Sequence, residues 1–136
     1  HRATGPCGRC GIGPLDRGEI HAACSGADVL VMPSIDDGLA NGLLEGMAAG
    51  LCPLVSKVFA DTVEHLHHGF IVDRVSPARL AEAIEWLDQN RAAVAHMGAA
   101  ARAVVAKMRP EREAAAYLDL FRELLAKRKT ERGSPA

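Results

Sequence analysis

Apolar residues along the chain fall into short continuous runs and longer stretches with helical spacing. The runs Val29–Met32, Leu51–Ser56 and Gly69–Val72 are typical of strands buried on both faces, as in a parallel sheet. Short helices are expected at Asp16–Cys24 and Asp61–Leu66, and another helix ends at about Ala49. Three further helices are expected after the last strand, because apolar residues recur there at helical spacing. Their apolar positions are Leu80, Ala83, Ile84 and Leu87 in the first, Val94 to Met108 in the second and Tyr117 to Leu125 in the third. This alternation predicts an α/β fold, with a Rossmann-like parallel sheet and flanking helices.

Residues that start and stop helices support the same reading. Ser76 followed by Pro77 is a cap and first-turn proline, and Asn41 is expected to cap the helix that ends near Ala49. Gly50 stands where a C-terminal cap glycine belongs. Pro110 separates the last two helices.

Apolar content divides the chain into three parts. Residues 1–15 are rich in Gly, Pro and Arg and predict a disordered or non-native-like N-terminal segment. Residues 16–128 carry the periodic pattern and predict one folded domain. Residues 129–136 predict a frayed tail.

Composition excludes several classes of function. The 136 residues include 16 Lys and Arg and 17 Asp and Glu, so a net charge of −1 gives no basis for binding nucleic acid. No apolar run is long enough to span a membrane. The 4 cysteines are scattered, which predicts a reduced, cytoplasmic protein. Cys7 and Cys10 are half of a zinc knuckle at best, because no second pair follows.

The segment Pro33–Gly50 carries the candidate chemistry. It follows a predicted strand, begins as an acidic, glycine-bearing loop and continues as a helix. Ligands of open α/β sheets bind where strands end, and a helix N-terminus there offers backbone N–H groups to phosphate. Asp37 lies in the loop, and Glu45 follows eight residues later. An anion site flanked by two carboxylates suits a nucleotide-sugar.

The same residues resemble a known motif. Pro33-Ser34, Asp37-Gly38-Leu39-Ala40 and Leu44-Glu45-Gly46-Met47-Ala48-Ala49-Gly50 are similar to the donor-site pattern of retaining GT-B glycosyltransferases of family 4, the glycosyl transferases group 1. The resemblance runs from about Asp16 to Leu125. This chain has Asp where the pattern has its first Glu, Leu39-Ala40 for Phe-Gly, and Ala60-Asp61 for Gly-Gly.

The resemblance implies a role for each site residue. Glu45 would accept hydrogen bonds from the donor ribose hydroxyls. Asp37 would be the catalytic residue, which contacts the transferred sugar or stabilises the positive charge that develops at its anomeric carbon. Backbone N–H groups would bind sugar hydroxyls and pyrophosphate at Gly38, Leu39, Ala40, Asn41, Gly42 and Leu43. The structural alternatives are a turn residue at Asp37 and a Glu45 that only favours the helix dipole.

The resemblance also implies a larger protein. The chain would be a partial C-terminal half of a GT-B enzyme, lacking its N-terminal acceptor domain and inactive alone. The nucleotide-sugar donor would be a substrate, and no cofactor is expected. Any contact with a membrane surface would come through the missing domain.

Three histidines raise the question of a metal. His65, His67 and His68 have spacings at which ligands can converge. No carboxylate or cysteine is obviously placed to complete a site, so the pattern favours a solvated helix end and no metal is expected. Trp86 lies near an apolar stripe and is expected to pack rather than to stack on a ligand.

Two other functions compete with a glycosyltransferase. The order of a strand followed by Asp36-Asp37-Gly38 superficially resembles a receiver-like signalling module, but the strand-bound acidic pair that receivers need is missing. The chain would otherwise be a non-catalytic remnant that folds without turnover.

Overall fold

The computed structural model describes residues 14–38, 40–108 and 110–132. The elements follow in the order α1 (Arg17–Ser25), β1 (Val29–Met32), α2 (Asn41–Ala49), β2 (Cys52–Ser56), the 3-10 helix η1 (Lys57–Phe59), β3 (Phe70–Val72), α3 (Pro77–Gln89), α4 (Arg91–Val105) and α5 (Pro110–Arg132). Among these residues, no helix has the length and apolar character needed to cross a membrane.

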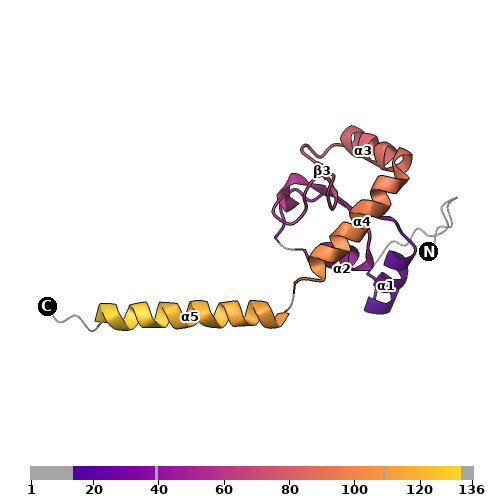
Figure 1. Cartoon of the computed structure of the whole chain (residues 1–136). Coiled ribbons are helices and arrows are strands. Elements are labelled where there is room, and N and C mark those ends of the chain that lie inside the picture. The colour runs from indigo at the N-terminus through magenta and orange to yellow at the C-terminus, as the bar shows by residue number, and fades with distance from the viewer. Residues whose placement is uncertain (1–13, 39, 109, 133–136) are drawn as a thin grey trace.

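The strands form a parallel sheet in the order β1-β2-β3. Val29 of β1 is in register with Cys52 of β2, and Leu54 of β2 with Phe70 of β3. Each connection between strands carries helical structure. Figure 1 shows α1 to α4 gathered in one body with β3, and α5 extending away from them. The predicted Rossmann-like α/β fold is confirmed. All strands point the same way, so their carboxyl ends meet at one edge of the sheet.

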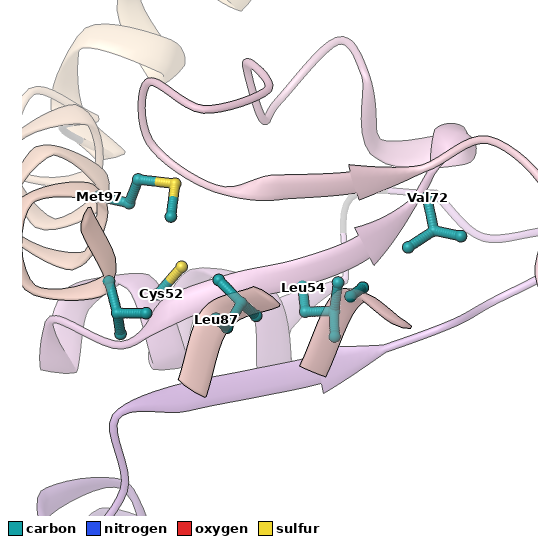
Figure 2. Close-up of a cluster of buried hydrophobic side chains, with 7 residues drawn as sticks. Cys52, Leu54, Val72, Leu87 and Met97 are labelled. Atoms are coloured by element: carbon teal, nitrogen blue, oxygen red, sulfur yellow. The ribbon is translucent and has the colours of Figure 1, made fainter. Parts of the chain in front are cut away.

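Strand β2 is the centre of the core, and all of its residues are buried. Alternate side chains face opposite sides. Cys52 and Leu54 pack in one cluster, shown in Figure 2, with the other members Val72, Ala83, Leu87, Val94 and Met97. Val55 packs in the second cluster, with the other members Leu43, Met47, Phe59, Val63 and Ala101. Helix α4 contributes to both clusters, so it joins the two layers.

Most of the expected helix signals are confirmed. Ser76 Oγ accepts a hydrogen bond from the Arg79 N–H at 3.2 Å, and Pro77 is the first residue of α3. Gly50 ends α2 with a φ of 88°, a left-handed conformation that glycine adopts without the steric cost of a Cβ. Ile84, which was expected on the packed face of α3, is 49% exposed.

Two local predictions are wrong. Asn41 does not cap α2: it is already helical, and Ala40 holds the cap position with no side-chain hydrogen bond. Asp61–Leu66 is not a helix: the segment consists of turns and an isolated bridge between His65 and Gly69. Val63 is then buried in the core, which holds this segment as a series of turns.

Helix α5 runs away from the rest of the domain (Figure 1). Its large apolar side chains are more than half exposed at Tyr117, Leu118, Phe121, Leu124 and Leu125. The helix continues to Arg132, past the residue at which the frayed tail was expected to begin. The other predicted terminal segment, residues 1–15, lies outside the described residues except for Pro14 and Leu15.

The close approach of α4 to the end of α2 gives a test of this packing. A Cβ on Gly98 would meet the Gly50 carbonyl oxygen well inside van der Waals contact. We expect Gly98→Ala to lower the free energy of unfolding by about 1–3 kcal/mol, because backbone must move. A Cβ on Gly42 meets nothing within 4 Å, so Gly42→Ala should change stability by less than about 1 kcal/mol. Urea unfolding followed by circular dichroism compares the two, and equal stability would contradict the packing.

Candidate functional site

The loop between β1 and α2 lies at the carboxyl edge of the sheet. It is fastened to β2 by one hydrogen bond, in which the Ser56 hydroxyl donates to the Ser34 carbonyl oxygen at 2.5 Å. Ser56 is 3% exposed and is the last residue of β2. This bond holds the start of the loop beside the neighbouring strand, so the position of the loop depends on the sheet register.

The N-terminus of α2 is free of side-chain capping. Ala40 has no side-chain oxygen, and its carbonyl accepts from the Leu43 and Leu44 N–H groups at 3.0 and 3.3 Å. Asn41 and Gly42 begin the helix and are exposed. The first N–H groups of a helix have no partner within it, and the helix dipole favours negative charge there. This end of α2 can therefore bind an anion.

The two carboxylates predicted from the sequence lie on either side of that helix start. Asp37 is exposed, and its only described side-chain contact is with Ser34 Oγ at 3.4 Å. Glu45 is exposed, and none of the described residues forms an ion pair with it. Glu45 lies past the first helical turn, which holds no acidic residue. The interaction of an acidic residue with the helix dipole is confined to the first turn, so it does not explain why a glutamate stands at position 45.

The predicted backbone donors differ in their surroundings. Ala40 holds the cap position of α2, and Asn41 is the exposed first residue of that helix. Gly38 and Gly42 border open space, because an added Cβ would meet nothing within 4 Å at either position. Leu43 does not fit the predicted role: its side chain is fully buried and its N–H already bonds to Ala40. Leu39 lies outside the described residues. No packing among the described residues requires glycine at 38 or 42, whereas a ligand that approaches the main chain closely would require it.

Ser56 is the residue that sequence reasoning missed. It was included in a predicted strand, but its bond to the loop 22 residues earlier could not be read from local sequence. A hydroxyl at the end of a fully apolar buried run was the available signal, because buried polar groups need a partner.

The histidine turn differs from its prediction. His65 has a structural role. Its Nδ1 accepts a hydrogen bond from the Ile71 N–H at 2.9 Å, and its ring packs edge-on against Phe70. His67 and His68 instead lie close to Glu64, and one ligand atom from each of these three residues lies within 4.8 Å of the others. A carboxylate is therefore placed beside the histidines, contrary to the expectation from sequence.

Burial shifts the pKa of two groups. The pKa of His68 is lowered, first by desolvation and then by the neighbouring His67, with Glu64 opposing the shift. Burial raises the pKa of the Cys52 thiol from 9.0 to about 11, so this cysteine is an inert core residue.

A cavity of about 570 Å³ lies apart from the candidate site. It lies between β3 and α3 and is lined by Phe70, Ile71, Val72, Asp73, Arg74, Arg79, Glu82, Ala83 and Trp86. Trp86 packs against Phe70 with ring centroids 5.2 Å apart and contacts the first core cluster, which agrees with the expected packing role. None of the predicted site residues that the structure describes lines this cavity.

Comparison with known proteins decides which family this site belongs to. Residues 11–104 match the family described as glycosyl transferases group 1. The chain is a member of that family. This membership decides against a receiver-like signalling module. No match to a curated protein sequence was found.

Solved structures agree with the family. Sucrose-phosphate synthase from Thermosynechococcus elongatus is 28% identical, with a TM-score of 0.74 over 85% of this chain and 30% of that chain. The C-terminal domain of a glycosyl transferase group 1 family protein (LpcC) from Francisella tularensis is 20% identical, with a TM-score of 0.63 over 70% and 50%. Anabaena HepE, solved in complex with UDP-glucose, is 20% identical, with a TM-score of 0.62 over 67% and 26%. The chain thus spans half or less of the length of each of these three proteins.

The Ser56 hydrogen bond gives a test of how the loop is held. We expect Ser56→Ala to lower the free energy of unfolding by about 0.5–1.5 kcal/mol and to speed amide exchange in residues 34–38. Ser25→Ala is the matched control, because Ser25 is an exposed serine whose hydroxyl bonds within α1 to His21. Hydrogen exchange measured by mass spectrometry distinguishes them. Unchanged loop exchange in Ser56→Ala would show that something else holds the loop.

Proposed function

We propose that this chain is the donor-binding part of a retaining GT-B glycosyltransferase, which transfers a sugar from a nucleotide-sugar to an acceptor. The observation that carries the proposal is the uncapped N-terminus of α2, flanked by the exposed carboxylates Asp37 and Glu45. Membership of the glycosyl transferases group 1 family supports it. UDP-glucose in the Anabaena structure makes this compound the first donor to test.

In the proposed complex, the donor pyrophosphate lies at the start of α2. Backbone N–H groups at Gly38, Asn41 and Gly42 donate to phosphate and sugar oxygens, and the helix dipole adds to the attraction. Glu45 accepts hydrogen bonds from the ribose diol. A carboxylate suits that task because its two oxygens can accept from two neighbouring hydroxyls.

Asp37 acts on the transferred sugar. As the bond between the anomeric carbon and the leaving phosphate oxygen breaks, the sugar gains oxocarbenium character, and a nearby anion stabilises it. The acceptor hydroxyl oxygen then bonds to that carbon on the face that the phosphate left. The leaving phosphate oxygen takes the electron pair of the broken bond and accepts the proton of the acceptor hydroxyl, so that the nucleoside diphosphate departs. The hydrogen bond from Ser34 helps to hold Asp37 in the loop.

The acceptor is assigned to a second domain outside this chain. We propose that this chain alone does not transfer sugar, that the full-length enzyme acts in the cytoplasm, and that transfer needs no divalent metal at Asp37 and Glu45. A non-catalytic remnant is the competing possibility. A donor screen of the full-length protein separates the two, because a remnant gives no turnover with any nucleotide-sugar.

Glu45 gives the first functional test. We expect Glu45→Ala in the full-length protein to raise the dissociation constant of the donor roughly tenfold to a hundredfold, because lost charge-assisted hydrogen bonds are worth about 1.5–3 kcal/mol. Glu45→Gln should be milder, because one acceptor oxygen remains. Isothermal titration with UDP-glucose and with other nucleotide-sugars measures the change. An Ala variant with the affinity of the parent protein rules out the ribose role.

Asp37 gives the second test. We expect Asp37→Asn to lower turnover more than donor affinity, because its interaction strengthens only in the transition state. Asp37→Glu should be tolerated, since the family pattern that the sequence resembles has Glu at that place. Steady-state kinetics of both variants, with metal present and chelated, provides the measurement. Full turnover in Asp37→Asn, or loss of wild-type activity on chelation, contradicts the assigned role.

A further inference from the structure

The turn that precedes β3 gathers three side chains with metal-ligating atoms. His67 Nδ1 lies 3.7 Å from Glu64 Oε2, and the ring centroids of His67 and His68 are 5.3 Å apart. One ligand atom from each of Glu64, His67 and His68 lies within 4.8 Å of the other two. These residues lie outside the loop at Asp37 and take no part in the proposed sugar transfer.

We propose that Glu64, His67 and His68 bind a zinc-class divalent cation. Two imidazoles and one carboxylate are a ligand set that zinc uses in proteins, with water in the remaining position. In tetrahedral coordination, two ligand atoms that each lie about 2.1 Å from zinc are about 3.4 Å apart. Ligand atoms separated by up to 4.8 Å must therefore approach one another by as much as about 1.4 Å when the metal binds.

The turn can make that adjustment. The side chains of His67 and Glu64 are 61% and 73% exposed, so both are free to rotate toward a common ion. The backbone beneath them is fixed, because the Glu64 carbonyl accepts from the N–H groups of His67 and His68 at 3.2 Å each. Buried His68 then serves as the fixed ligand, and the other two close onto it.

Metal binding must break one existing hydrogen bond. The Glu64 N–H donates to His68 Nδ1 at 3.3 Å. A metal on Nδ1 takes that lone pair, and a metal on Nε2 leaves the proton of the neutral ring on Nδ1. The Glu64 amide loses its acceptor in either case. Metal binding therefore costs the free energy of this one long hydrogen bond. The loss can be followed through the NMR resonance of the Glu64 amide.

The experiment titrates zinc into the untagged chain with Cys7, Cys10 and Cys24 changed to Ser, so that thiolates do not compete. Isothermal titration should give one zinc per chain, and the Glu64 amide should shift in a ¹⁵N spectrum. His67→Ala and Glu64→Gln change exposed side chains and should each weaken zinc binding about tenfold or more. His96→Ala is the matched control, since His96 is an exposed histidine on α4.

The outcomes are distinct. Weakened binding in His67→Ala and Glu64→Gln, unchanged binding in His96→Ala and a shifted Glu64 amide support the site. Absence of binding to the parent chain at millimolar zinc overturns it. So does binding by His67→Ala as tight as the parent's, or a Glu64 amide that zinc leaves unmoved. Circular dichroism of each variant confirms that the fold is retained, so that lost binding is not lost structure.

Discussion

The burial of strand β2 is the constraint on which the rest of the structure depends. Its backbone pairs with a strand on each side, and its side chains fill clusters on both faces. Each large apolar side chain that is fully buried, such as Leu54, contributes about 1.5–3 kcal/mol. A one-residue slip of β2 would exchange the two faces, so this burial fixes the register. The register in turn places the ends of all three strands at one edge.

The candidate site lies at that edge, and it depends on a helix N-terminus that lacks a stabilising cap. Ser56 ties the loop after β1 to the end of β2, and α2 then begins at Asn41, with Ala40 in the cap position and no side-chain hydrogen bond to cap it. A serine or aspartate at Ala40 would stabilise α2 by about 1 kcal/mol, but its side chain would occupy the N–H groups that an anion needs. The exposed Asp37 and Glu45 likewise lack ionic partners among the described residues. Groups left unsatisfied in the folded chain are the ones a charged ligand can use.

The turn before β3 shows how the core can also preorganise a surface. Val63 is buried on one side of the turn, and Gly69 packs against Val63 and Pro53 on the other, leaving no room for a Cβ. The few residues between these anchors close on themselves, with Leu66 at a φ of 60°. His67 and Glu64 are therefore presented side by side to solvent. Apolar packing below the turn, rather than attraction between the ligands, sets their spacing.

The sequence by itself determined the features that depend on local backbone chemistry. The strands were read from their apolar runs, the stop at Gly50 from its freedom at positive φ, and the start of α3 from Ser76 and its proline. Asp37 and Glu45 could be assigned to the same candidate site from the sequence, because one strand-loop-helix unit carries both.

Tertiary structure decided what depends on competition for buried space and on distant partners. The segment Asp61–Leu66 became turns because Val63 had to reach the core, and Ser56 found its acceptor 22 residues away. The grouping of Glu64 with His67 and His68, and the exclusion of His65, likewise required the folded turn. Local sequence sets backbone preferences, but only packing between separated segments selects which side chains meet.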